Sequence, residues 1–315
     1  MKVIFMGTPD FAVPCLEMLI KEGYEIPLVV TQPDRQRGRG HKVSFSPVKE
    51  CALNNGIEVF QPESLKNDEL MPYLDRIKPD AIVVVAYGKI LPKSVLSYPP
   101  SGCINVHGSL LPKLRGAAPI QWSIINGDKE TGITTMLMNE GMDTGDILLR
   151  YPVEIEDTDT AGSLFDKLMV VGENALRATL IKLKDKKIVR IKQNEEEATY
   201  APMIKKQDAL IDFSKTPYEI KNMLRGMNPA PVAYTYLEGK KIKLYDGFIG
   251  EETDDTDYGK IASISEEKGL GIVCGGGILY IKELHAENSR RMSVSEYMLG
   301  HKIEVGQSFK GGQEA

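Results

Sequence analysis

Short apolar runs alternate with helical patterns through the first half of the chain. Five runs have the length of a strand, and they cover residues 2–6, 28–31, 81–86, 103–106 and 133–138. The run from Ala81 to Ala86 contains no polar residue, which is typical of a central parallel strand covered on both faces. This alternation predicts an α/β domain built on a doubly wound, mostly parallel sheet.

Two dipeptides predict where helices begin between these strands. Thr8-Pro9 follows the first strand and Ser46-Pro47 follows the second. In each pair a hydroxyl residue can cap the helix, and proline suits the first helical position. A longer helix is predicted from Thr160, because apolar residues recur there at the spacing of one buried face.

The pattern changes near residue 185, where a run of Lys and Arg precedes three consecutive glutamates. We expect a linker over residues 190–207, between a first domain of residues 1–189 and a second of residues 208–315. The second domain begins with one short helical pattern from Tyr218 to Met227. Five short segments separated by Gly and Asp follow, over residues 232–237, 241–248, 259–264, 269–274 and 278–284. Their spacing predicts a small OB-like β-barrel.

Composition restricts the class of protein further. The chain has 315 residues, 42% hydrophobic and 26% charged, which excludes low-complexity disorder, collagen and coiled coil. The net charge of -5 means that any nucleic-acid site must be a local patch. No segment approaches the roughly 20 apolar residues of a membrane span. The four cysteines are scattered, so we expect no disulfide framework, no bound metal and a reduced, cytoplasmic location. We also expect a monomer.

The turn after the first strand does not fit a dinucleotide-binding motif. Gly7-Thr8-Pro9-Asp10 offers one glycine where the GxGxxG fingerprint needs three. A nicotinamide cofactor is therefore not expected, and a capped strand-to-helix turn is the better interpretation.

Candidate chemistry gathers at the end of the strand at residues 103–106. Asn105 and His107 are two residues apart, so their side chains point to the same face. Ligands bind at the carboxyl ends of strands in open α/β sheets. Asn105 and His107 could together hold a carbonyl oxygen that becomes an oxyanion. Asp143, in the glycine-flanked loop 141–145, could orient the imidazole and favour its charged form.

Each of these residues also has an ordinary structural interpretation. His107 alone is as well explained as a hydrogen-bonded structural histidine, and Asp143 alone as a turn residue. Residues 109–112 could be a packed loop at the exit of the strand. Only their combination favours a catalytic site.

Three segments together resemble the 10-formyltetrahydrofolate-dependent formyltransferases, namely GTPDFA, NVHGSLLPKLRGAAPIQW and MNEGMDTGDIL. The resemblance covers essentially the whole chain. It implies a Rossmann-like formyltransferase fold, 10-formyltetrahydrofolate as co-substrate and no metal. It also implies that Asn105, His107 and Asp143 are catalytic. The folate-contacting residues that it implies are Ser109, Leu110, Leu111 and Pro112.

A basic segment between residues 34 and 42 bears on the acceptor of the formyl group. It contains two glycines and no apolar residue, which predicts a mobile loop. Its cations are Arg35, Arg37, Arg39 and Lys42. Such a run is usually a solvated surface, but this one leaves the end of a predicted strand, where arginines could grip phosphates. The resemblance implies that the loop engages the acceptor stem of tRNA. The implied reaction formylates the α-amine of methionine on the initiator tRNA, for translation initiation.

Two alternatives stay open. One is a formyltransferase with a small acceptor, such as a nucleotide sugar or glycinamide ribonucleotide, although the second domain and the basic loop argue against it. The other is a non-catalytic RNA-binding protein, against which the intact Asn105, His107 and Asp143 count. Acidic residues outnumber basic ones beyond Asp208, so an RNA contact there needs a local basic face. The candidates for that face are Lys240, Lys241, Lys243, Arg290 and Arg291, together with Lys186, Lys187, Arg190 and Lys192 before it.

The basic loop generates a kinetic prediction. Replacing Arg39 and Lys42 by alanine should raise the KM for charged tRNA and flatten its salt dependence, because each phosphate contact releases condensed counterions. The KM for the folate should stay nearly constant. Steady-state kinetics at two salt concentrations, with each substrate varied in turn, measure both effects. An unchanged KM for tRNA would indicate that the loop is only a solvated surface. It would also favour the alternative of a small acceptor.

Overall fold

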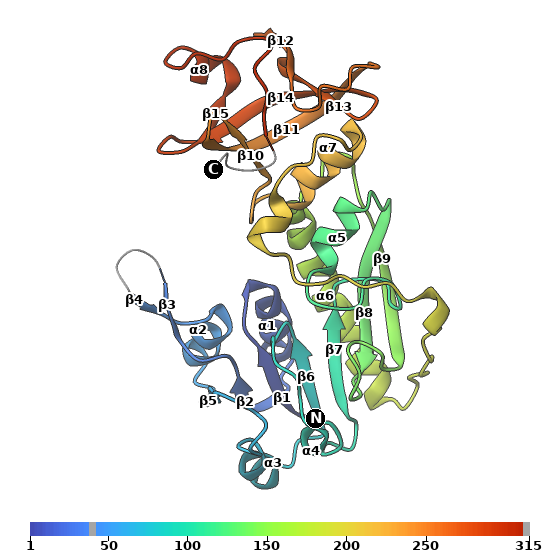
Figure 1. Cartoon of the computed structure of the whole chain (residues 1–315). Helices are drawn as coiled ribbons and strands as arrows, with labels where there is room; N and C mark the ends of the chain where they lie inside the picture. The colour runs from blue at the N-terminus through green and yellow to red at the C-terminus, as the bar shows by residue number, and fades with distance from the viewer. Residues whose placement is uncertain (38–41, 311–315) are drawn as a thin grey trace. The chain divides into compact units, whose positions relative to one another are not determined.

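A computed structural model of the chain (Figure 1) describes residues 1–37 and 42–310, with the backbone alone for residues 35–37, 42 and 43. The chain forms two compact units. The N-terminal unit comprises Met1–Pro119, Glu130–Glu154 and Phe165–Pro202. The C-terminal unit comprises Ile120–Lys129, Ile155–Leu164 and the chain from Met203 onward.

The N-terminal unit is built on a seven-stranded sheet with the order β5-β2-β1-β6-β7-β8-β9. The strands are β1 (Lys2–Gly7), β2 (Glu25–Val30), β5 (Val59–Phe60), β6 (Ala81–Val85), β7 (Cys103–His107), β8 (Glu130–Leu137) and β9 (Ile147–Glu154). The first five run parallel, whereas β8 and β9 are antiparallel to their neighbours. The mostly parallel α/β sheet predicted from the sequence is therefore confirmed.

The helices that accompany these strands are short, apart from one. They are α1 (Val13–Lys21), α2 (Pro47–Asn54), α3 (Met71–Ile77), α4 (Lys93–Leu96), α5 (Pro119–Ile125) and α6 (Ala161–Lys184). Of these, α5 from Ile120 onward and α6 up to Leu164 group with the C-terminal unit. A 3-10 helix, η1 (Asp10–Ala12), precedes α1. Another, η2 (Glu195–Glu197), follows α6 along the chain. The long helix predicted from Thr160 corresponds to α6.

The two predicted helix starts have different outcomes. Ser46 caps α2 as expected, because its Oγ accepts a hydrogen bond of 3.1 Å from the backbone N–H of Lys49. The prediction that Thr8 caps a helix is wrong. The chain after Thr8 first forms η1, which has no side-chain cap, and the Thr8 hydroxyl instead donates to the backbone oxygen of Tyr87 at 3.2 Å.

The sheet buries apolar side chains from neighbouring strands together. Ile4, Ile82 and Val84 pack in one cluster with Leu74 of α3. The parallel register pairs Val84 of β6 with Asn105 of β7. The carboxyl end of β7 is thereby fixed beside that of β6, which places Asn105 and His107 at the rim of the sheet.

The C-terminal unit contains an antiparallel sheet with the order β10-β11-β14-β13-β12, to which β15 adds by pairing with β14. The strands are β10 (Tyr234–Leu237), β11 (Lys240–Glu252), β12 (Ile261–Ser265), β13 (Gly269–Cys274), β14 (Gly277–Ala286) and β15 (Met292–Ser293). The helices of this region are η3 (Lys206–Ala209), α7 (Pro217–Gly226) and α8 (Val294–Met298). The short helix and the five strands predicted from the sequence are confirmed.

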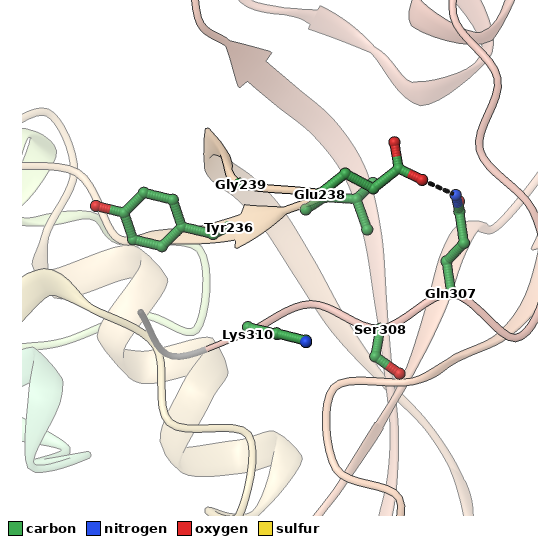
Figure 2. A pocket seen from close by; sticks show the side chains of 7 residues that line it. Tyr236, Glu238, Gly239, Gln307, Ser308 and Lys310 are labelled. Carbon is green, nitrogen blue, oxygen red and sulfur yellow. Dashed lines mark hydrogen bonds between the residues drawn. The ribbon is translucent and has the colours of Figure 1, made fainter. Parts of the chain in front are cut away.

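The segment of residues 308–310 pairs with the chain at both edges of this sheet, at β10 and just before β12. Lys310 forms a bridge with Tyr236 of β10, and Ser308 forms one with Lys260, just before β12. Beside the first bridge a pocket is lined by Tyr236, Glu238 and Lys310, among others, and Gln307 Nε2 donates to Glu238 Oε1 at 2.8 Å across it (Figure 2). The residues that line this pocket include none of those expected to carry the chemistry.

The division into units differs from the boundaries expected at residues 189 and 208. Residues 190–202, expected as a linker, group with the N-terminal unit. Ile191 and Ile147 exchange two backbone hydrogen bonds of 2.9 and 2.8 Å, and Ala201 N–H donates to the Arg115 carbonyl at 2.7 Å. Charged composition does not reveal such pairing, because backbone groups make it whatever side chains they carry. Within the described residues, no helix is long and apolar enough to cross a membrane.

Candidate active site

His107 ends β7 and is buried, with 6% of its surface exposed. Its Nε2 lies 3.0 Å from the carbonyl oxygen of Leu114. Because a carbonyl can only accept, the proton of a neutral ring belongs on Nε2. The other nitrogen, Nδ1, lies 3.7 Å from Asp143 Oδ2, which is longer than a hydrogen bond. Nδ1 is therefore the ring nitrogen that faces the carboxylate.

Asp143 is held in a tight turn with a left-handed backbone, at φ 54°. Its Oδ2 accepts a hydrogen bond of 2.9 Å from the backbone N–H of Gly116. Gly145 allows the turn to close, since a Cβ at that position would lie 1.8 Å from the Leu137 carbonyl oxygen. The turn thus points the Asp143 carboxylate at two groups, the Gly116 N–H and the His107 ring.

Asn105 differs from His107 in having an uncommitted side chain. It is half-buried on β7, between Val84 of β6 and Met136 of β8 in the sheet register. Among residues 1–37 and 42–310, none forms a hydrogen bond with its side-chain amide. Its N–H groups are therefore available to a ligand at the rim.

Residues 109–112 follow directly and are mostly packed inward. Ser109, Leu111 and Pro112 are buried, and Leu110 is half-buried. The Ser109 hydroxyl donates to the Lys113 carbonyl at 2.6 Å. The segment therefore offers a ligand its backbone and part of Leu110, while the other three side chains fix its shape.

Thr134 of β8, which the sequence analysis did not single out, ties this segment to the histidine. It pairs with His107 in the sheet and is fully buried. Its hydroxyl donates to the Ser109 carbonyl at 2.7 Å and accepts from the Leu111 N–H at 3.0 Å. Two threonines, Thr134 and Thr135, interrupt the apolar run of residues 133–138, and these polar positions were the available signal.

The basic segment is more regular than the sequence suggested. Backbone pairing forms an antiparallel hairpin of β3 (Arg35–Arg37) and β4 (Lys42–Ser44), so the prediction of a loop is wrong for those residues. Backbone pairing forms this hairpin although Val43 is the one apolar residue in its two strands. Arg35, Arg37 and Lys42 lie in its strands, whereas Arg39 lies outside the described residues.

The base of this hairpin is anchored at the same rim of the sheet. Asp34 accepts hydrogen bonds from Lys49 Nζ at 2.5 Å and from Gln61 Nε2 at 2.9 Å. The hydrogen bond from Lys49 is the main reason that the pKa of Asp34 lies below its usual value. Gln32 Nε2 donates to the Tyr87 carbonyl at 2.9 Å, just beyond the end of β6. The hairpin therefore starts beyond β2, and Gln32 links its base to the end of β6, the strand next to β7.

Some candidates for a basic face in the C-terminal unit are already paired. Arg290 and Arg291 form ion pairs with Glu296 and Glu283. Lys241 is different, since its Nζ lies 3.4 Å from the centre of the Tyr234 ring. Burial, followed by the nearby Lys243 and Lys206, lowers the pKa of Lys241. These three lysines form a local cationic cluster in this unit.

Thr134 gives a testable prediction for the site. Replacing Thr134 by valine should lower the free energy of unfolding by about 1–3 kcal/mol, because the buried Ser109 carbonyl and Leu111 N–H both lose a partner. Urea unfolding of the full chain measures this change. Thr134→Ser, which keeps the hydroxyl, should be less destabilised than Thr134→Val. Equal stability of the valine variant and the unchanged protein would contradict the bridging role.

Comparison with known proteins shows the family of this chain. The sequence model of a family described as formyl transferase matches residues 1–180, and that of its C-terminal domain matches residues 203–302. The chain is 51% identical to a methionyl-tRNA formyltransferase of Acetivibrio thermocellus, over 98% of this chain and 99% of that protein. It is also 51% identical to one of Caldanaerobacter subterraneus, over 98% and 100%.

A solved structure shares the fold at lower identity. An N-formyltransferase from Helicobacter canadensis, solved with folinic acid and dTDP-3-aminofucose, superimposes with a TM-score of 0.68 at 21% identity. The match covers 93% of this chain and 100% of that one. Since two family domains and relatives of about half-identical sequence span nearly the whole chain, the chain belongs to the formyl transferase family.

Proposed function

We propose that this chain transfers the formyl group of 10-formyltetrahydrofolate to the α-amine of methionine on the initiator tRNA, giving N-formylmethionyl-tRNA for translation initiation. The observation that carries the chemistry is the position of His107 Nδ1, 3.7 Å from Asp143 Oδ2 at the carboxyl end of β7. The acceptor is supported by relatives named methionyl-tRNA formyltransferase that are 51% identical over 98% of the chain.

The proposed reaction needs no covalent bond to the protein. The lone pair of the amine attacks the formyl carbon, and the carbonyl electrons move to its oxygen. The tetrahedral intermediate collapses by breaking the bond between that carbon and N10 of the folate. N10 takes up one proton and the amine nitrogen loses one, so the reaction balances. Catalysis then depends on positioning the reactants and stabilising the oxyanion.

Asn105 and His107 are proposed to bind that oxyanion. The Asn105 amide has N–H groups free to donate at the rim. The Leu114 carbonyl occupies Nε2 of His107, at 3.0 Å, so the ring has Nδ1 available for the reacting groups. A proton on Nδ1 would provide a second donor to the oxyanion.

Asp143 is proposed to stabilise the protonated imidazole and to assist removal of the proton from the amine. Its carboxylate is 17% exposed and is fixed by the Gly116 N–H, so the negative charge stays beside the ring. An opposite charge at this distance favours the cationic form of an imidazole.

The two substrates are proposed to reach the site from different elements. The folate would lie against the backbone of residues 109–112 and against Leu110, with Ser109, Leu111 and Pro112 shaping that surface. Arg35, Arg37, Arg39 and Lys42 would meet phosphates of the acceptor stem. The anchoring of Asp34 by Lys49 and Gln61 supports this, because it fixes where the hairpin leaves the rim.

We also propose that the protein acts as a cytoplasmic monomer. The proposed acceptor is a substrate of translation, which supports the location. All three residues proposed as catalytic come from one N-terminal unit of one chain, which supports a monomer.

The assay for this function compares acceptors. Purified protein with 10-formyltetrahydrofolate should formylate charged initiator tRNA, and do so faster than charged elongator tRNA. A dTDP-linked amino sugar serves as the small acceptor. Transfer to the sugar and not to either tRNA would establish the small-acceptor alternative. Salt-sensitive RNA binding without any transfer would establish the non-catalytic alternative.

Alanine variants of the oxyanion donors test the mechanism. Asn105→Ala or His107→Ala should lower turnover by a factor of about 10² or more, as loss of an oxyanion donor does. The KM for tRNA should change little, since neither side chain lies in the basic hairpin. His301→Ala, in the C-terminal unit, is the matched control and should keep normal turnover. Near-normal turnover in both site variants would refute the assignment.

A further inference from the structure

The turn that holds Asp143 is bound by a side chain from the segment that the sequence marks as a linker. Gln193 Nε2 donates hydrogen bonds to two carbonyl oxygens of the turn, that of Asp143 at 2.7 Å and that of Gly145 at 2.8 Å. One amide group thus joins the residue with the left-handed backbone to the glycine two positions later. Any rotation of the turn would break one of these bonds.

Gln193 is itself oriented by a buried cation. Its Oε1 accepts hydrogen bonds from Arg115 Nε at 3.1 Å and Nη2 at 2.8 Å. Since the guanidinium can only donate, it fixes which end of the Gln193 amide faces the turn. Arg115 is 1% exposed, so this orientation is set inside the N-terminal unit.

The charge of Arg115 is balanced by Glu195. The Glu195 carboxylate accepts from Arg115 Nη1 at 2.8 Å and from Nη2 at 2.9 Å. The hydrogen bond from Arg115 lowers the pKa of Glu195. Glu195 is therefore ionised throughout the neutral range. The orientation of Gln193 by Arg115 does not depend on a group that changes its charge near neutral pH.

The backbone on either side of Arg115 contacts both candidate catalytic residues. The preceding residue, Leu114, provides the carbonyl at His107 Nε2, and the following residue, Gly116, provides the N–H at Asp143 Oδ2. The Arg115 backbone is held in turn by the Thr199 carbonyl at 2.8 Å and by the Ala201 N–H at 2.7 Å. Residues 193–201 thus hold the turn and the loop from one side.

We propose that Gln193, oriented by Arg115, is a positioning residue that sets the Asp143 carboxylate against His107. This inference rests on the proposed function. Gln193 acts on the backbone of the turn, and its amide nitrogen is committed to two protein carbonyls, so it is not itself proposed to touch substrate. Gln193 and Arg115 are then part of the machinery that positions the proposed catalytic groups.

Gln193→Glu tests the proposal sharply. The carboxylate can still accept both hydrogen bonds from Arg115, but it has no N–H to donate to Asp143 and Gly145, and it faces their carbonyl oxygens. We expect turnover to fall by about 10- to 100-fold, as misplacement of a catalytic group by about an ångström does. The KM values for the folate and for tRNA should stay within about twofold, because neither proposed binding surface includes Gln193.

Asn194→Asp is the matched control. It makes the same change from amide to carboxylate one residue away. Within residues 1–37 and 42–310, the Asn194 side chain forms hydrogen bonds only in its own turn, with the Glu196 N–H and with Glu197. Its turnover should match that of the unchanged protein. Equal losses in Gln193→Glu and Asn194→Asp would overturn the proposal, because they would show a general effect of added charge on this segment.

A double-mutant cycle separates positioning from a structural role. If Gln193 acts through Asp143, adding Gln193→Glu to Asp143→Asn should lower turnover by less than about threefold beyond Asp143→Asn alone. If the loss of turnover in the double variant equals the product of the losses in the two single variants, the proposal is overturned. Urea unfolding checks that each variant is folded. If Gln193→Glu does not fold, Gln193→Ala enters the same cycle with the same criterion.

The activity of the unchanged protein tests the proposed function, and the activity of the Gln193 variants tests the positioning role. An unchanged protein that transfers no formyl group to any acceptor refutes the proposed function. An active unchanged protein whose Gln193 variants keep normal turnover refutes the positioning role alone.

Discussion

The guanidinium of Arg115 is a cation that is almost wholly removed from water. A buried charge is costly unless it is paired and its donors are satisfied, so this side chain gathers acceptors around it. It finds them in Gln193 and Glu195, which lie about eighty residues further along the chain. The result is that three segments, at residues 114–116, 141–145 and 193–195, meet at one place. His107 and Asp143 take their positions from these segments.

The parallel sheet supplies the rigid base for this arrangement. β7 is held between β6 and β8, and Thr134 of β8 fixes the backbone that leaves β7. Strand ends of this kind tolerate irregular loops because the sheet beneath them does not move with the loops. The site therefore combines a histidine on a strand with an aspartate on a turn. The turn needs support from outside the sheet, and Gln193 supplies it.

The two units divide the properties that a formyl transfer to RNA would require. The residues proposed as catalytic and the basic hairpin belong to the N-terminal unit. The C-terminal unit carries a cationic cluster around Lys241 within an otherwise acidic region. Local clusters of this kind, rather than net charge, decide where a polyanion can bind on a protein whose total charge is negative.

The sequence by itself determined the features that depend on local periodicity and spacing. It predicted the buried strands around Ala81 and Cys103, the long helix after Thr160 and the strands of the second half. The Ser46 cap was also correct, and the two-residue spacing of Asn105 and His107 placed both side chains on one face of a strand. These features depend on neighbours within a few residues, which the chain order shows directly.

Only the tertiary structure decided the features whose partners are distant in sequence. Thr8-Pro9 looked like Ser46-Pro47, yet Thr8 bonds to a carbonyl seventy-nine residues away and caps nothing. Residues 190–202 of the expected linker group with the N-terminal unit because their backbone pairs with residues near 115 and 147. Arg115 and Gln193 carried no local signal, and Thr134 carried only that of a polar residue in a largely apolar run, since the importance of all three comes from the groups that they join. Hydrogen-bond partners across a fold are set by which strands and loops become neighbours, and the order of residues along the chain does not specify that.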